Sequence, residues 1–147
     1  MTDLINHPPH YTQHPSGIES IKIAQMGGFN LGNAIKYLYR HEHKGDPISD
    51  LKKARFYLQR LTELDAIQIE LINSHDTQGA INQIQEVLKH EPANTPLHHA
   101  LRLLQTIIFS AGSPSIQIHG PKAVQAINQK LTDLEPETHT PKIYEEQ

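Results

Sequence analysis

A row of basic side chains at helical spacing is the first feature of this sequence that could do chemistry. Lys36, Arg40 and Lys44 stand four residues apart, with Asn33 and His43 near the same face and Tyr37 next to Lys36 in the sequence. Like charges at this spacing repel each other mildly on a helix, so such a row usually has an anion or a partner carboxylate. Arg offers phosphate a planar fork and Lys a point charge. The row therefore predicts a phosphate-binding face, and a solvated face paired with nearby carboxylates is the alternative.

A second set of polar side chains shares one side of the next helical segment. Asp50, Lys53, Tyr57 and Arg60 follow at steps of three, four and three residues. In a helical hairpin this side would lie beside the basic row, where Asp50 would orient a cation or hydrogen-bond a ribose or base. The alternative is a lattice of interhelical ion pairs, each of which contributes little to stability.

The N-terminal segment places ring side chains between prolines. His7, His10 and Tyr11 flank Pro8 and Pro9. Because proline fixes φ and lacks an amide donor, the segment predicts an extended arm. Such an arm would fold over a ligand and supply donors to a phosphate or base. The alternative is a solvated proline-rich terminus.

The sequence lacks the residues that several common kinds of functional site require. The chain has no Cys, which excludes disulfides, a thiolate nucleophile and a Cys-type zinc site. It also has no glycine-rich phosphate loop and no serine elbow. Three histidine pairs lack Asp or Glu in metal-binding register, so no metal site is expected; they are His7/His10, His41/His43 and His98/His99.

Helices must position these groups. Ser16 and Glu19 match a capping box, which predicts a short helix with Ile18 and Ile21 facing inward. A second helix is expected over residues 30–43 and, after a turn at 44–47, a third to about residue 73, capped by Ser49 or Asp50. The two long helices form an antiparallel hairpin through their apolar stripes: Leu31, Ala34, Ile35 and Leu38, then Leu51, Ala54, Leu58 and Leu61.

The second half of the chain predicts further helices over residues 76–90, 95–110 and 121–134, the last with Pro121 at its first position. Residues 115–119 alternate in polarity and fit a strand, a helix or a loop equally. The fold class is therefore all-α: a helical hairpin with a proline-rich N-terminal arm and a C-terminal helical extension. We divide the chain into a nucleotide-binding region (1–73), the extension (74–135) and a flexible tail (136–147).

Composition narrows the function. Net charge is −3 over 147 residues, with eight Lys and Arg against five Asp and Glu in residues 1–60 and five against eleven afterwards. An acidic chain neutralises few phosphates, which argues against nonspecific nucleic-acid binding but not against one small anion. No apolar stretch approaches the roughly 20 residues of a membrane span. With neither Cys nor a signal peptide, a cytoplasmic location is expected.

The motifs NHPPHY, GIES, GNAIKYLYRHEHKG and DLKKARFYLQRL, taken in order over residues 6–61, resemble a family of small tailed-bacteriophage proteins. That family is catalogued mostly as a domain of unknown function, and at least one member is described as a nucleotide kinase without the usual phosphate loop. The chain departs from it at His41–His43 and at Gln13–Pro15. The matching positions are Asn6, His7, Pro8, His10, Tyr11, Gly17, Ile18, Glu19, Gly32, Lys36, Tyr37, Arg40, Lys44, Gly45, Asp50, Leu51, Lys53, Ala54, Tyr57 and Leu58.

The resemblance implies a phage protein acting in the host cytoplasm on a nucleotide. One hypothesis is a nucleoside monophosphate kinase with His10, Lys36 and Arg40 as catalytic candidates and Mg²⁺ accompanying the nucleotide. A second is a non-catalytic sponge that sequesters a nucleotide, including a cyclic signal of host immunity. A third is a host-protein module that docks through Leu97, Leu101, Leu104 and Ile108. Because a short hairpin buries little surface alone, a homo-oligomer is expected.

Overall fold

The structure is a computed structural model that describes residues 5–6, 13–43, 45–63, 77–110 and 114–135. These residues are mostly helical and include no strand, which confirms the predicted all-α class. The predicted arm at 7–12, the end of the third helix beyond residue 63 and the tail at 136–147 lie outside them. The helices are α2 (Ser20–Ala24), the 3₁₀ turn η1 (Gln25–Gly27), α3 (Gly28–Arg40), α4 (Pro47–Glu63), α5 (Thr77–Lys89), α6 (Pro96–Ser110) and α7 (Pro114–Leu134).

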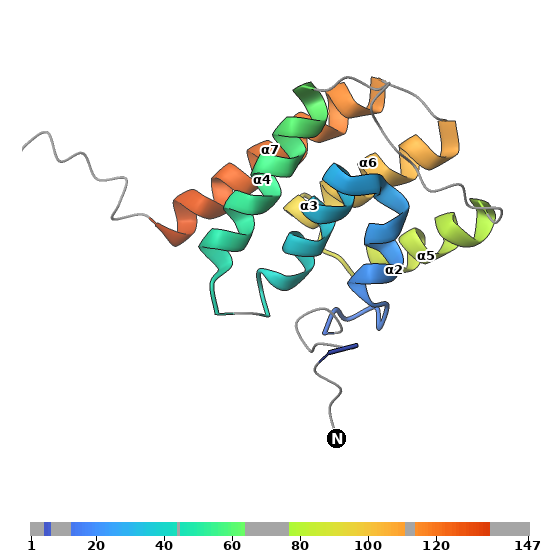
Figure 1. Cartoon of the computed structure of the whole chain (residues 1–147), viewed down its shortest axis with the longest axis horizontal. Coiled ribbons are helices and arrows are strands. Elements are labelled where there is room, and N and C mark those ends of the chain that lie inside the picture. The colour runs from blue at the N-terminus through green and yellow to red at the C-terminus, as the bar shows by residue number, and fades with distance from the viewer. Residues whose placement is uncertain (1–4, 7–12, 44, 64–76, 111–113, 136–147) are drawn as a thin grey trace, which may run out of the picture.

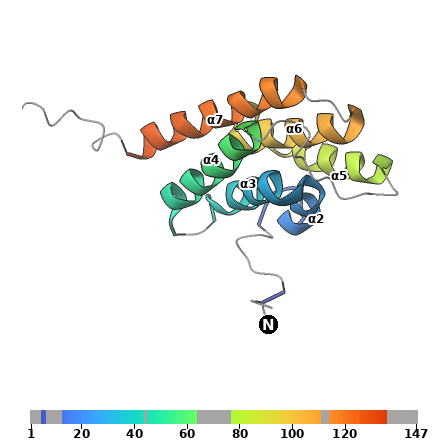
Figure 2. The same cartoon turned by 45° about the horizontal axis from the view of Figure 1, so that its top comes forward.

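The helices form two layers of three (Figures 1 and 2). The N-terminal layer contains α2, α3 and α4, and the C-terminal layer contains α5, α6 and α7. Each helix of one layer contacts its counterpart in the other, so α2 packs on α5, α3 on α6 and α4 on α7. The predicted α3–α4 hairpin is present, and the C-terminal helices cover one side of it.

One hydrophobic core lies between the layers. Every residue of the two predicted stripes is buried. The same core includes Ile84 of α5, Leu101 and Leu104 of α6, and Ile127 of α7. The C-terminal helices therefore supply much of the burial that the hairpin lacks alone. The boundary predicted between residues 73 and 74 lies outside the described residues and stays a prediction.

The first helix begins later than the capping box predicts. Gly17 has φ of +75°, which a helix cannot contain, and α2 begins at Ser20. The Ser16 hydroxyl instead accepts the backbone N–H of Ile18 in the preceding turn. As a result Ile23 faces the core, and Ile21, predicted to face inward, is 64% exposed.

The start of α4 also differs from the prediction. The helix begins at Pro47, and the carboxylate of Asp46 accepts the backbone N–H of Ser49 at 3.0 Å. Asp46 is therefore the N-cap and Pro47 the first helical residue, a favoured pair at helix starts. Ser49 and Asp50, predicted as caps, lie inside the first turn, which frees Asp50 for a contact across the hairpin.

The last helix begins seven residues before its predicted start. Residues 115–119, for which the sequence left strand, helix and loop open, lie in the first turns of α7, and Pro121 lies inside the helix. A proline disfavours helix at the preceding residue partly through a clash with that residue's Cβ. The preceding residue here is Gly120, which has no Cβ, so the helix continues past the proline.

Candidate functional site

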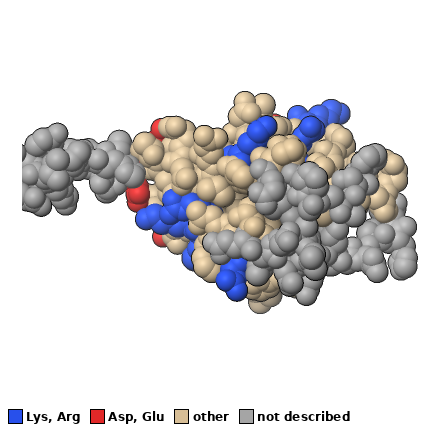
Figure 3. Space-filling view, turned by 90° about the horizontal axis from the view of Figure 1, so that it is seen from above, with Lys and Arg blue, Asp and Glu red and all other residues tan. Residues whose placement is uncertain are grey.

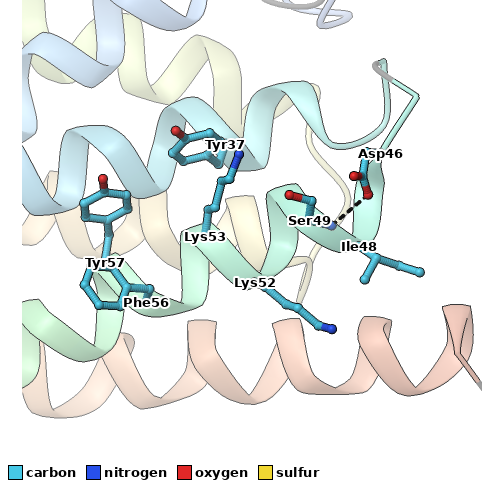
Figure 4. Close-up of a pocket in the computed structure, with 8 residues that line it drawn as sticks. All are labelled: Tyr37, Asp46, Ile48, Ser49, Lys52, Lys53, Phe56 and Tyr57. Carbon is cyan, nitrogen blue, oxygen red and sulfur yellow. Dashed lines mark hydrogen bonds between the residues drawn. The ribbon is translucent and has the colours of Figure 1, made fainter. Parts of the chain in front are cut away.

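An open cleft of about 540 Å³ lies on the surface of the α3–α4 hairpin (Figure 4). It is lined by Tyr37 of α3 and, from α4 and the residue before it, by Asp46, Ile48, Ser49, Lys52, Lys53, Phe56 and Tyr57. We call it the tyrosine–lysine cleft. It contains three of the predicted site residues, namely Tyr37, Lys53 and Tyr57.

Three basic side chains lie close to the ring of Tyr37. The Nζ of Lys36 lies 4.4 Å from the ring centroid and the Nζ of Lys53 5.4 Å. The guanidinium carbon of Arg40 lies 5.1 Å from the same centroid. Cations at these distances are attracted to the face of an aromatic ring. Neither Lys36 nor Lys53 forms an ion pair with a carboxylate among the described residues, so both ammonium charges remain available to an anion.

Aromatic rings continue along the same surface. The rings of Tyr37 and Tyr57 are nearly parallel, at 8°, with centroids 6.1 Å apart, and both side chains point to the same side in Figure 4. Phe29 and Phe56 each meet Tyr57 edge to face and are 68% and 59% exposed. Sequence reasoning missed these two phenylalanines. The sequence pattern that could have identified them is a large apolar residue at a position that should be polar on an amphipathic helix.

The predicted pairing of the two helix faces is present at Asp50. Its Oδ1 accepts a hydrogen bond from the Nε of Arg40 at 2.9 Å. The Asp50 side chain is 1% exposed and that of Arg40 14%, so this is a buried ion pair. This contact is the interhelical ion pair that was the alternative to a ligand-binding role, and the predicted role of Asp50 in orienting a cation for a ligand stays a prediction. The pair joins α3 to α4, and the guanidinium of Arg40 also lies beside the Tyr37 ring.

The other predicted site residues are less central. The amide nitrogen of Asn33 donates to the carbonyl oxygen of Phe29 at 2.7 Å, within α3. Lys36 touches the Tyr37 ring but is not among the residues that line the cleft. Four predicted residues, His7, His10, Tyr11 and Lys44, lie outside the described residues, and their role stays a prediction.

A second polar cluster joins the end of α3 to α7. The Nε2 of His41 lies 2.9 Å from the Nζ of Lys130, which also donates to Glu42 at 2.8 Å. The Nδ1 of His41 contacts the carbonyl oxygen of Leu38. These contacts require a neutral ring that donates from Nδ1 and accepts at Nε2. Burial and then the charge of Lys130 lower the pKa of His41 below its ordinary value.

We expect this histidine to make folding sensitive to acid. In the unfolded chain His41 gains a proton near its ordinary pKa of 6.5, whereas the folded chain resists protonation until a lower pH. The unfolded state therefore binds more protons, and the free energy of unfolding should fall as the pH is lowered from about 7 to about 5. Urea unfolding across this range should show a shallower loss for His41→Gln than for the parent. Equal slopes would contradict the assignment.

A third polar cluster holds the N-terminal segment on the turn between α5 and α6. The Nε2 of His14 lies 2.8 Å from a carboxylate oxygen of Glu91, which also accepts from the hydroxyl of Thr95. The His14 ring packs on Tyr39 with centroids 5.3 Å apart. Burial and the charge of Glu91 raise the pKa of the Tyr39 hydroxyl. These contacts fix the segment that precedes α2.

Comparison with known proteins gives one match. Residues 5–59 match DUF3310, a family described as protein of unknown function. The DUF3310-like region contains α2, α3 and most of α4, and hence the whole tyrosine–lysine cleft, whereas α5–α7 lie outside it. No curated protein and no solved structure matches the chain.

Two features that the described residues lack bear on the class of site. Among residues 5–6, 13–43, 45–63, 77–110 and 114–135 there is no group of three His, Asp or Glu side chains arranged to hold a metal ion. None of the described helices is both long enough and apolar enough to cross a bilayer.

Proposed function

We propose that this protein binds a nucleotide in the tyrosine–lysine cleft. The observation that carries the proposal is the Tyr37 ring, whose centroid lies 4.4 Å from the ammonium group of Lys36 and 5.4 Å from that of Lys53 and which is nearly parallel to the ring of Tyr57. Unpaired ammonium groups attract phosphate, and exposed aromatic faces stack on bases. A nucleotide carries a phosphate at one end and a base at the other, so it matches both the lysines and the aromatic rings of the cleft.

The surface around the cleft favours one small ligand over a long polyanion. On the one face that Figure 3 shows, the Lys and Arg side chains of the described residues form separate groups and not a continuous basic stripe. Lys52 turns away from the tyrosine rings in Figure 4, and its Nζ lies 3.6 Å from Glu135. Lys53 is then the lysine of the cleft wall that faces the rings. A few charges beside stacked rings suit a mononucleotide or a cyclic dinucleotide.

Among the hypotheses for this site, binding without turnover has the most support. Phosphoryl transfer requires positioned groups that hold Mg²⁺ on the phosphates, commonly carboxylates. Of the described residues that line the cleft, Asp46 is the one carboxylate, and it caps α4. Asp50 is directed to Arg40. The host-protein module has less support, because Leu97, Leu101 and Leu104 of its docking stripe are buried in the core.

Variants at exposed positions of the cleft should weaken binding without unfolding the protein. We expect Phe56→Ala to reduce nucleotide affinity roughly tenfold, since stacking on one base is worth about 1–3 kcal/mol. Lys53→Gln should cost a similar factor by removing a charge from the phosphate. Isothermal titration calorimetry should follow a thermal-shift screen of mononucleotides and cyclic dinucleotides, because a ligand of the native state raises the melting temperature.

The controls separate this cleft from general electrostatics and binding from catalysis. Lys22→Gln removes an exposed lysine of α2 that lines neither this cleft nor the groove between α5 and α6, and it should leave nucleotide affinity unchanged. Chromatography of the bound ligand, with a triphosphate donor present, should recover it unconverted. Formation of a diphosphate would instead show the kinase activity. If no nucleotide raises the melting temperature, the proposal fails.

A further inference from the structure

Basic side chains also gather on the C-terminal layer, outside the DUF3310-like region. We call the group the histidine cluster; it consists of His98, His99 and Arg102 of α6 and His119 and Lys122 of α7. The rings of His98 and His99 are 5.3 Å apart, edge to face. Because α6 and α7 pack on each other, the charges of Arg102 and His98 on α6 reach His119 on α7.

The cluster is poor in compensating negative charge. None of its five members forms an ion pair with a carboxylate among the described residues, and Glu91 is the acid whose charge reaches His98. The Nδ1 atom of His119 is buried and has no hydrogen-bond partner within the part of the chain that the structure describes. Burial, followed by the charges of Lys122 and Arg102, lowers the pKa of His119. Burial, followed by the charges of His98 and Lys122, likewise lowers the pKa of His99. Five basic groups that repel one another are stabilised when an anion joins them.

An open groove adjoins the cluster and gives a ligand access. It has a volume of about 620 Å³ between α5 and α6, and Lys89, His98 and Arg102 line it. The backbone N–H of Asn94 donates to the Nδ1 of His98, so the neutral ring carries its proton on Nε2 and can donate it. The one acid on the wall, Glu86, lies 3.2 Å from the Nε2 of His90.

We propose that the histidine cluster binds a phosphoryl anion at a second site that is separate from the tyrosine–lysine cleft. Arg102 supplies the planar fork and Lys122 a point charge, while the imidazoles of His98, His99 and His119 donate hydrogen bonds. The chemistry fits free phosphate, pyrophosphate or the phosphates of a nucleotide. This site does not depend on the nucleotide site.

Binding at the histidine cluster should strengthen in mild acid. The pKa values of the three imidazoles lie below the ordinary histidine value, so these rings gain protons only as the pH falls below that value, and each proton adds positive charge toward the anion. The other charged groups that face the cluster are Lys89, Glu86 and His90 on α5 and Glu91 in the turn before α6. By linkage, a bound anion must in turn raise the pKa values of the imidazoles that it contacts.

The test uses inorganic pyrophosphate and the full chain. Calorimetric titration near pH 5 and near pH 7.5 should give tighter binding at the lower pH, where the imidazoles with lowered pKa values gain protons. Because charge-assisted hydrogen bonds are the strong ones, Arg102→Gln and Lys122→Gln should each raise the Kd about fivefold or more. Histidine ring signals in NMR titrations should show pKa values that rise at saturating pyrophosphate. Arg60→Gln, which removes an exposed cation of α4, should change the Kd less than about twofold.

Two results would overturn the second site. One is the absence of both heat and NMR shifts with pyrophosphate. The other is an equal loss of affinity in Arg60→Gln, which would indicate only a general effect of net charge. Titration with a nucleotide separates the two proposals. If Lys122→Gln loses nucleotide affinity and Lys53→Gln does not, the nucleotide phosphates bind at the histidine cluster. That result would overturn the proposal of nucleotide binding in the tyrosine–lysine cleft and leave the second site standing.

Discussion

Replacing Asp50 by alanine should destabilise the fold by about 3 kcal/mol, because the substitution leaves a mostly buried guanidinium without its carboxylate. The Asp50 side chain is 1% exposed, and the Nε of Arg40 lies 2.9 Å from its Oδ1. Breaking a buried pair usually costs about 3–5 kcal/mol, and the 14% exposure of Arg40 places this site at the lower end. Urea unfolding followed by circular dichroism measures the loss.

Two further variants show whether the ion pair is the cause. Asp46→Ala removes an exposed acid at the start of the same helix and should cost only about 1 kcal/mol, the usual value of an N-cap. The double variant Arg40→Met/Asp50→Leu replaces the pair by apolar groups and should recover most of the loss, since buried ion pairs are often replaceable. If Asp50→Ala costs less than the Asp46→Ala cap variant, the pair does not stabilise the hairpin as argued.

The Arg40–Asp50 ion pair shows which features of the hairpin can be predicted from the spacing of residues and which cannot. Steps of three and four residues place Asp50, Lys53 and Tyr57 on one helix face, and the hairpin turns that face toward Arg40. Periodicity therefore located both helix faces and their contact. It did not locate the helix starts, because Asp46–Pro47 and Ser49–Asp50 both contain good capping residues. Only the packing of the helix, which buries Asp50, distinguishes them.

Contacts between distant segments account for the rest of what the sequence could not predict. His98 and His119 lie far apart in the sequence, and only the packing of α6 on α7 brings them near each other. Phe29 of α3 reaches Tyr57 of α4 through the packing of those two helices, whereas Phe56 is the sequence neighbour of Tyr57. The C-terminal layer also changes the argument for self-association. Because α5–α7 cover the hairpin, its core needs no second subunit, and homo-oligomerisation stays a prediction that light scattering would test.

Gly32→Ala should destabilise the protein by about 2 kcal/mol, although alanine is the better helix former by about 1 kcal/mol. Gly32 is buried in α3 where α2 crosses it. A Cβ at this position would lie 2.5 Å from the carbonyl oxygen of Ala24. That oxygen belongs to the backbone, so the clash cannot be relieved by a side-chain rotation, and α2 must move away from α3.

Gly45→Ala is the matched control, because a Cβ at Gly45 meets nothing within 4 Å. It lies in the exposed turn before α4 and should change the stability by less than about 0.5 kcal/mol. Urea unfolding of the two variants beside the parent tests the pair. A Gly32→Ala protein at least as stable as the parent would show that α2 does not pack closely on α3. The segment carrying Ile23 into the core would then be held by weaker contacts than the structure indicates.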